Sequence, residues 1–303
     1  MKIKNSTIYR KIDNNPKLKK YLEKLKKSNF YNIIRKVSHS RMLQLFPRYV
    51  KATKGLRKKH LRILKWVVKS KEKTNFTYDL TEKNIEYLAH MIANIFNEKY
   101  DKIITYINEA RNDIELKEYV IMRTENENEL NRVSDKRSDF GRRLGWYAIV
   151  RQMKPKIVVE TGVYNGLGSV LLCYAIMKNS KEGYQGKYYG TEINPKGGLL
   201  LGEKYKKYGE ILYGDSIKSL KNLDEEIDIF INDSDHSPNY EYQEYQVIKN
   251  KLSEKGVLLG DNSHCSDKLS KFSLENNRQF MFFSEEPANH WYSGAGIGIS
   301  YKK

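Results

Sequence analysis

The chain has 303 residues, of which 39% are hydrophobic and 30% charged, as in a soluble globular protein of roughly two domains. No stretch approaches the ~20 apolar residues of a membrane span, and the start of the chain lacks the apolar core of a secretory signal. The two cysteines, Cys173 and Cys265, are too few for a disulfide framework and favour a cytoplasmic protein.

The net charge of +18 is concentrated at the N-terminus. Residues 1–73 hold 24 lysines and arginines against three acidic residues, whereas the rest of the chain is nearly neutral. We therefore divide the chain into a basic helical arm (1–73), a helical region with a linker (74–134) and an α/β domain (135–303). The arm is expected to meet an anionic partner, such as a membrane surface, a nucleic acid or an acidic glycan.

The arm contains the segment LRKKHLRILKWVVKSK, which interleaves Leu61, Leu64, Trp66 and Val68 with lysine and arginine. Such a helix can lie at the interface of an anionic membrane, with its cations on the lipid phosphates. An apolar stripe beside a charged face is also typical of a helix that packs on its own domain. Both interpretations stay open, and the first would place the protein at the inner face of a membrane.

The region after the arm is predicted to be helical. Apolar residues at three- and four-residue intervals predict one or two helices within residues 80–124. The polar stretch RTENENELNRVSDKRSD predicts a linker. Ser134 or Asp135 is then expected to cap a helix that Pro155 ends.

From residue 157 onward, short apolar runs alternate with helical stretches, which predicts a parallel sheet covered by helices on both faces. Two more apolar runs near the C-terminus are close enough to pair as an antiparallel edge. The successive runs are KIVVET, KYYGTEI, GEILYG, IDIFIND, KGVLLGDN, RQFMFFSEE and GAGIGISYKK.

The first run leads into a glycine-rich turn and the start of a helix, IVVETGVYNGLGSV. Gly162, Gly166 and Gly168 allow a tight turn and a close approach of the backbone to a ligand. Their spacing differs from that of the dinucleotide fingerprint. Glu160, just before the first glycine, would repel a pyrophosphate but could hold a positively charged ligand.

The next two strands also end in acidic residues. Glu192 follows Gly168 by 24 residues, close to the offset at which an acid meets the hydroxyl pair of a ribose. Asp215 and Ser216 follow the third strand. Three strands thus end in an acid at the carboxyl edge, where open α/β sheets bind their ligands.

These motifs resemble those of class I methyltransferases that use S-adenosylmethionine, over about residues 135–303. The resemblance implies a Rossmann-like sheet of seven strands, mostly parallel, with an antiparallel last strand. It also implies that the glycine loop holds the methionine portion of the cofactor, Glu192 the ribose, and Asp215 with Ser216 the adenine side. The expected cofactor-binding residues are Glu160, Gly162, Gly166, Gly168, Ser169, Glu192, Asp215 and Ser216.

The fourth and fifth strands end in further polar side chains. Asp233 follows one strand, and Asp261 and Asn262 follow the other, so on neighbouring strands they would converge. Their oxygen atoms suit Mg²⁺, which would polarise an acceptor hydroxyl. His236, three residues after Asp233, can remove the hydroxyl proton near neutral pH. We therefore expect catalytic roles for His236 and Asp233 and a metal site at Asp233, Asp261 and Asn262.

Two branches of this fold resemble the chain. In catechol-type O-methyltransferases a lysine stands where this chain has His236, which argues against a catechol acceptor. The branch of macrocin O-methyltransferase and cephalosporin hydroxylase (methyltransferase family 24) is more similar, because it carries a D-x-x-H motif. It often methylates sugar hydroxyls, which implies a saccharide or glycolipid acceptor. That branch more often ends the fifth strand in two acids, so Asn262 departs from it.

Alternative interpretations are kept beside this one. Asp233 and Asp235 could simply cap the next helix, with Asp261 and Asn262 as ordinary turn residues. The chain could also be an RNA methyltransferase whose arm grips phosphates, although NDSDH is not the motif of a base-modifying enzyme. A third possibility is a non-catalytic binding module on the same fold.

Overall fold

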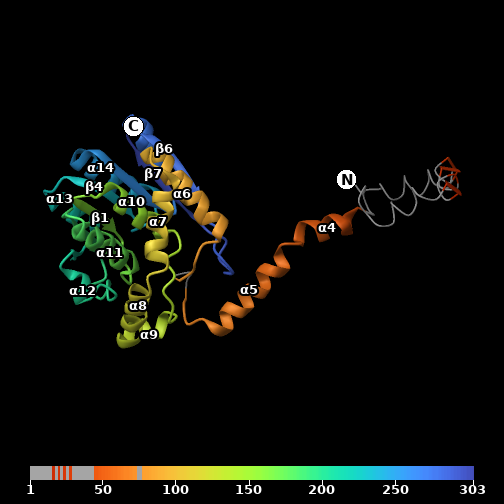
Figure 1. Ribbon diagram of the computed structural model, residues 1–303, viewed down its shortest axis with the longest axis horizontal. Coiled ribbons are helices and arrows are strands. Elements are labelled where there is room, and N and C mark those ends of the chain that lie inside the picture. Colours follow the sequence, from red (N-terminus) through yellow and green to blue (C-terminus); the bar gives the residue numbers. More distant parts are fainter. Residues whose placement is uncertain (1–15, 18–19, 21–22, 25–26, 29–43, 74–76) are drawn as a thin grey trace. The chain divides into compact units, whose positions relative to one another are not determined.

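The computed structural model describes residues 16–17, 20, 23–24, 27–28, 44–73 and 77–303 (Figure 1). The chain forms two compact units, Met1–Leu64 and Lys65–Lys303. Helix α4 (Leu45–Thr53) lies in the first unit, and α5 (Leu56–Lys69) continues from the first into the second. The boundaries expected at residues 73 and 134 stay predictions. No helix in the described part of the chain is long and apolar enough to cross a membrane.

The second unit is built on one seven-stranded sheet, in the order β3-β2-β1-β4-β5-β7-β6. β1 to β5 pair in parallel, and β7 runs antiparallel to both β5 and β6. This confirms the predicted α/β class and the antiparallel last strand. The strands are β1 (Ile157–Thr161), β2 (Lys187–Glu192), β3 (Gly209–Tyr213), β4 (Ile227–Asn232), β5 (Leu252–Asp261), β6 (Gln279–Ser284) and β7 (Gly296–Tyr301).

Helices cover both faces of the sheet, because the buried strands present apolar side chains on both sides. On β4, Ile229 and Ile231 belong to the larger core, together with residues of α6, α7, α8, α10 and α11. Phe230, between them, belongs to a second core with residues of α13, α14 and α15. The helices of this unit are α6 (Glu82–Phe96), α7 (Tyr100–Arg111), α8 (Ile114–Asn126), α9 (Asn128–Val133), α10 (Arg143–Met153), α11 (Leu167–Lys181), α12 (Glu203–Lys206), α13 (Ser216–Asn222), α14 (Pro238–Ile248) and α15 (Lys268–Glu275), with a 3₁₀ turn at Lys249–Lys251.

The segment before the sheet differs from expectation in two places. The predicted linker carries α9, because Leu130 gives this polar stretch one side chain to bury in the core. The helix expected from about residue 135 begins only at Arg143. Asp135 does not cap it, since its carboxylate accepts hydrogen bonds from the Ser70 hydroxyl and the Lys71 backbone N–H, each at 2.8 Å.

Candidate active site

A cavity of about 670 Å³ opens at the carboxyl ends of the parallel strands. Its walls come from the loops that follow β1 to β5, from the start of α10 and from the loop between β6 and β7. The side chains and backbone that line it are those of Arg142, Arg143, Gly162, Tyr164, Thr191, Glu192, Ile193, Gly214, Asp215, Ser216, Asp233, Ser234, Asp235, His236, Tyr240, Asp261, Asn262 and Tyr292.

Gly162 brings the loop after β1 against the end of β4. Its φ of +82° lies in the left-handed region, and a Cβ atom at this position would stand 2.0 Å from the carbonyl oxygen of Asp233. A side chain here is therefore excluded both by conformation and by space. Because Gly162 has no side chain, the predicted cofactor loop can pack directly against the backbone of Asp233, in the predicted catalytic loop. Both loops therefore line the same cavity.

Glu160 lies beneath this loop instead of in the cavity wall. Its buried carboxylate accepts hydrogen bonds from the Tyr188 hydroxyl at 2.5 Å and the Ser169 hydroxyl at 3.4 Å. Burial raises the pKa of Glu160 to about 7. Gly168 packs against this carboxylate, and Gly166, Gly168 and Ser169 are also absent from the cavity lining. These predicted cofactor residues support the loop from below.

Glu192, at the end of β2, does line the cavity. One carboxylate oxygen accepts the backbone N–H of Tyr164 at 2.6 Å, and the other accepts that of Asn194 at 2.8 Å. These two donors fix the orientation of the carboxylate. Each oxygen has a further lone pair, so a ligand with two neighbouring hydroxyl groups can still bind.

Asp215 and Ser216 stand at the start of α13 and also line the cavity. Asp215 caps the helix by accepting the backbone N–H of Lys218 at 2.8 Å, and it accepts the Tyr240 hydroxyl at 2.8 Å. The alternative in which Asp233 and Asp235 cap the helix after β4 is not seen, because the N-cap of α14 is Ser237 and has no side-chain capping bond; Asp235 accepts the backbone N–H of Ser237 at 2.9 Å. Ser216 donates its hydroxyl hydrogen to Glu244.

Glu244, on α14, was not anticipated from the sequence. Its buried carboxylate accepts hydrogen bonds from Thr161 at the end of β1 at 3.0 Å, from Asn232 at the end of β4, and from Ser234 at 2.9 Å, besides Ser216. Burial raises its pKa to about 7. No local pattern distinguishes this glutamate from any other on an amphipathic helix. It ties together three strand ends under the cavity.

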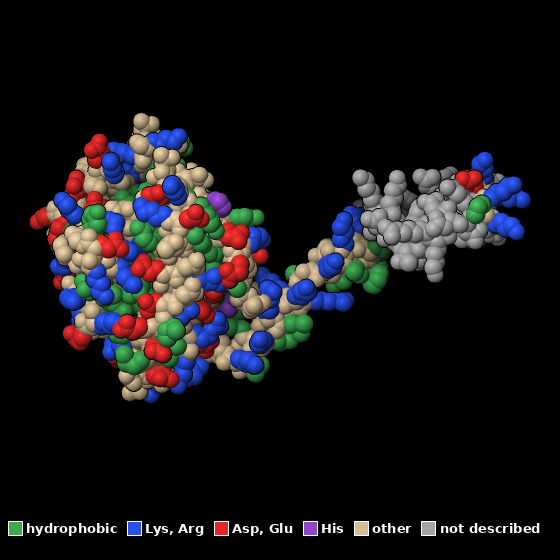
Figure 2. All heavy atoms as spheres, viewed as in Figure 1, with side chains coloured by type: hydrophobic (Ala, Val, Ile, Leu, Met, Phe, Trp, Pro, Cys, Tyr) green, Lys and Arg blue, Asp and Glu red, His purple; other side chains and the backbone are tan. Residues whose placement is uncertain are grey.

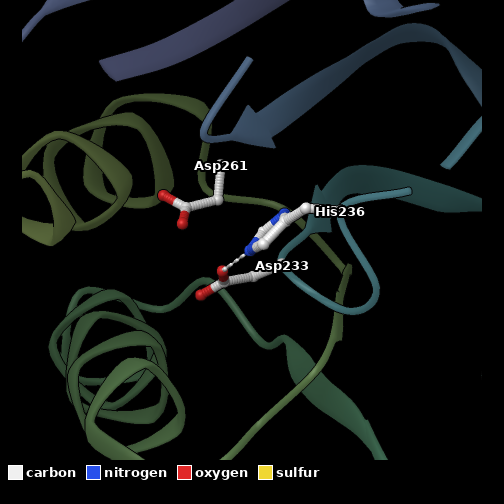
Figure 3. A group of neighbouring side chains, drawn as sticks. All are labelled: Asp233, His236 and Asp261. Carbon is white, nitrogen blue, oxygen red and sulfur yellow. Dashed lines mark ion pairs between the residues drawn. The ribbon is translucent and has the colours of Figure 1, made fainter. Parts of the chain in front are cut away.

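Asp233, His236 and Asp261 meet at the other end of the cavity, as drawn in Figure 3. Their nearest ligand atoms all lie within 4.8 Å of one another. The Nε2 atom of His236 is 3.7 Å from Asp233 Oδ1 and 3.1 Å from the side-chain nitrogen of Asn262. The ring is partly exposed and lines the cavity, so a ligand can reach it.

Two arginines that the sequence analysis did not single out hold the carboxylates of this group. Both oxygens of the fully buried Asp261 accept from Arg142, through Nε and, at 2.5 Å, through Nη2. Arg142 also donates to the Tyr78 hydroxyl. Arg143 Nη2 lies 3.9 Å from Asp233 Oδ2. The only signal in the sequence is the Arg-Arg pair at the start of a helix.

The two carboxyl groups have opposite pKa shifts. Burial and the negative charge of Asp261 raise the pKa of Asp233 well above its usual range. Burial also acts to raise the pKa of Asp261, but the Arg142 guanidinium and hydrogen bonds from Asp233 and Arg142 hold it below the usual value. Asp261 is therefore the ionised member of the pair, and Asp233 is the member that retains a proton.

The predicted magnesium site can be tested against these contacts. Mg²⁺ needs carboxylate oxygens that are free to coordinate it in near-ideal octahedral geometry. Asp261 already accepts two bonds from Arg142 and one from the Asn262 amide at 2.9 Å. Asp261 Oδ1 accepts one of these bonds and keeps a lone pair, so Asp233, His236 and Asp261 each still offer a ligand atom within 4.8 Å of the others. The Arg142 guanidinium on Asp261 brings a positive charge that opposes a cation bound through the same carboxylate.

Two other histidines and a tryptophan in the loops after β5 and β6 lie outside the cavity lining. His264 is exposed and contacts Cys265, and it does not line the cavity. His290 and Trp291 pack in an aromatic cluster with Tyr78. From this loop it is Tyr292 that reaches the cavity.

Comparison with known proteins bears on this arrangement. Residues 159–263, from β1 through the end of β5, match the model of a family described as a methyltransferase domain, over about a third of the chain. The match and the sheet support a class I methyltransferase.

Solved structures of methyltransferases are similar to the chain at low identity. A Podospora anserina methyltransferase crystallised with SAH matches at 17% identity, over 67% of this chain and 94% of that one, with a TM-score of 0.44. A Geobacter sulfurreducens methyltransferase matches at 16% identity, over 61% and 90% of the two chains, also with a TM-score of 0.44. No curated protein matches the chain.

Proposed function

We propose that this protein transfers a methyl group from S-adenosylmethionine to a sugar hydroxyl, with His236 as the general base. The observation that carries the proposal is that one cavity is lined both by Glu192, at the cofactor end, and by His236, beside a pair of carboxylates. A donor and an acceptor bound in this cavity would lie side by side.

The cofactor end is formed by residues that this chain already holds in place. When bound, S-adenosylmethionine would supply a methyl carbon that a nucleophilic oxygen can bond while the carbon–sulfur bond breaks and the sulfur leaves as the neutral thioether of S-adenosylhomocysteine. Glu192 would accept hydrogen bonds from its ribose hydroxyls, and Asp215 with Ser216 would contact its adenine side. The glycine loop would pass next to its methionine portion. Glu244 holds the strand ends that carry these groups.

The acceptor end removes a proton. A hydroxyl is a poor nucleophile until its proton leaves, and an imidazole exchanges protons near neutral pH. The single lone pair of His236 Nε2 faces the Asn262 side-chain nitrogen at 3.1 Å, so the acceptor hydroxyl would replace Asn262 as its hydrogen-bond partner before the proton is transferred. The ionised Asp261, within 4.8 Å, then stabilises the imidazolium that forms. His236 acts directly, and Asp261 acts through it.

The positive charge near the acceptor comes, in this proposal, from the protein itself. Arg142 and Arg143 together bring the same charge as a divalent cation, and each faces one carboxylate of the pair. We therefore propose no reaction step that involves magnesium, although a magnesium site was expected from the sequence. Arg142 keeps Asp261 ionised, which is the state that the imidazolium needs.

The acceptor class follows from the lining of the same cavity. Tyr292 lines the cavity near the acceptor end, and Tyr164 and Tyr240 line it beside Glu192 and Asp215, so the cavity offers aromatic surface along its wall. Such an environment offers both a flat apolar face and hydrogen-bonding groups, the combination that a sugar ring uses. A hydroxyl of a glycan, a glycolipid or a glycosylated natural product is the acceptor that we infer.

Two measurements test the proposal. Calorimetry with S-adenosylmethionine should show binding by the wild type and a loss of affinity in Glu192→Gln. Methyl transfer from labelled S-adenosylmethionine is then screened against sugar, glycolipid and RNA acceptors. Transfer to a sugar oxygen is the expected result. Transfer to RNA alone, or cofactor binding with no transfer to any acceptor class, would favour one of the two alternative functions.

A further inference from the structure

Helices α4 and α5 leave apolar side chains exposed in the most basic part of the described chain. Nine residues between Leu45 and Lys69 are lysine or arginine, and none is acidic. Figure 2 shows hydrophobic side chains open to solvent along both helices, among the cations. The large exposed apolar residues here are Leu45, Phe46, Tyr49, Val50, Leu56, Leu61, Leu64, Val67 and Val68.

The two kinds of side chain lie on different faces of α5. Leu61, Leu64 and Val68 follow a spacing of three and four residues, which places them on one face of a helix, and they are 67%, 61% and 83% exposed. A second face carries Lys58, Arg62, Lys65 and Lys69, spaced by four, three and four residues. The helix is therefore amphipathic, and its apolar face is exposed in the structure.

We propose that α4 and α5 bind the surface of an anionic lipid bilayer. The apolar side chains would enter the boundary between headgroups and acyl chains, and the cations would contact lipid phosphates. The charge of the segment is complementary to such a surface and to no neutral one. A nucleic acid would also attract the cations, but it offers nothing to a row of leucine and valine side chains.

The C-terminal part of α5 belongs to the unit that carries the cavity. The Trp66 ring lies 5.0 Å from that of Trp291, and Trp291 in turn lies 6.2 Å from Tyr292, which lines the cavity. The part of α5 in this unit, which includes Val68 and Lys69, is thus linked through two aromatic contacts to the acceptor end of the site. On the proposed function, this favours an acceptor sugar that is linked to a lipid.

The test measures membrane binding alone, so it does not depend on methyl transfer. Full-length protein is sedimented with vesicles of phosphatidylcholine, with and without 30% phosphatidylglycerol. We expect binding to the anionic vesicles only. Leu61→Glu with Leu64→Glu should lower the partition coefficient at least tenfold, because each leucine loses its apolar burial. The matched control, Ile114→Glu with Leu274→Glu, changes two apolar residues that are 70% and 81% exposed on α8 and α15, and it should bind like the wild type.

A second set of variants tests the cations. Lys58→Gln, Lys65→Gln and Lys69→Gln together should weaken binding about a hundredfold, since each cation near an anionic surface contributes ~1 kcal/mol, or about fivefold. The control replaces Lys99, Lys181 and Lys221 by glutamine. Unchanged partitioning of the Leu61/Leu64 variant would overturn the proposal. The proposal would also be overturned if the wild type bound a single-stranded RNA oligonucleotide tightly but did not bind anionic vesicles, and if the Leu61/Leu64 variant bound the RNA equally well.

Discussion

Charge at the acceptor end of the cavity is arranged by individual side chains. A buried carboxylate is costly unless a partner compensates it, and Arg142 compensates Asp261 with two hydrogen bonds. Asp233 lacks such a bidentate partner, and its pKa rises instead. His236 is therefore the group at this end that faces the cavity and that we propose as the base.

Replacing His236 by alanine tests its role as the base. Base catalysis is typically worth ~10²–10⁴-fold, so kcat for methyl transfer should fall by about that factor in His236→Ala. The affinity for S-adenosylmethionine, measured by calorimetry, should stay near the wild-type value, since the ring lies at the acceptor end. His264→Ala, an exposed histidine outside the cavity, is the control. A variant that keeps full kcat without His236 would remove the assignment.

The place of Arg142 leads to a prediction about magnesium. Titrating magnesium chloride into the wild-type protein should give no binding heat at millimolar concentrations, and methyl transfer should be the same in excess chelator.

In Arg142→Met the unpaired buried Asp261 should lower the free energy of unfolding by ~3–5 kcal/mol, measured in urea.

The double variant Arg142→Met/Asp261→Asn provides the control, because it removes both charges and should recover part of that loss. Saturable magnesium binding by the wild type, with activity that a chelator abolishes and magnesium restores, would show instead that the ion displaces Arg142.

Among the elements, the β1–α11 loop depends on the glycine at position 162. In Gly162→Ala the residue keeps a φ of +82° and its Cβ meets the backbone of Asp233. The left-handed conformation alone costs roughly 1–2 kcal/mol, and the contact adds to this. We expect a loss of stability larger than that and a weaker affinity for S-adenosylmethionine.

Gly183→Ala separates the two effects. Gly183 has a φ of +91°, but nothing lies within 4 Å of a Cβ atom there. Urea unfolding of this variant measures the conformational cost by itself. If the two variants lose equal stability and both keep their affinity for the cofactor, then the contact between the loop and the end of β4 has no role in binding.

The strands were predictable because buried parallel strands are short apolar runs bounded by turn residues. The acids after them share the carboxyl edge for the same topological reason, so Glu192, Asp215, Asp233 and Asp261 were expected in one place. Arg142 and Glu244 could not be anticipated, because a charged residue on a helix is buried only when distant partners meet it. Glu160 precedes the loop as expected, but Tyr188 and Ser169 turn its carboxylate away from the cavity.

For the molecule as a whole, two buried carboxyl groups make stability depend on pH. The pKa of Glu160 is raised from 4.5 to about 7 by burial, and that of Glu244 likewise. Between pH 4.5 and pH 7 both carboxyl groups still hold their protons in the folded state, whereas they have lost them in the unfolded state. The free energy of unfolding therefore falls as the pH rises through this interval. Above pH 7 this contribution is absent.

Glu160→Gln keeps the shape of the side chain and removes its charge. The wild type should lose on the order of 2–3 kcal/mol of stability between pH 5 and pH 8 through Glu160, and the variant should lack this loss. The free energy of unfolding of both proteins is measured in urea at both pH values, and the difference between them should grow by that amount in favour of the variant. An identical pH dependence of the two proteins would mean that Glu160 is ionised in the fold with no cost from burial.

Glu244 holds the ends of β1 and β4 and the start of α13 from underneath, while Arg142 and Tyr292 line the opposite wall and make no bond to it. Glu244 also bonds Ser234, beside Asp233, so the same carboxylate supports the donor end and the loop that leads to His236. The loop between β6 and β7 is outside this set of bonds. On the proposed function, substitutions around Tyr292 in that loop are the place to begin when changing the acceptor.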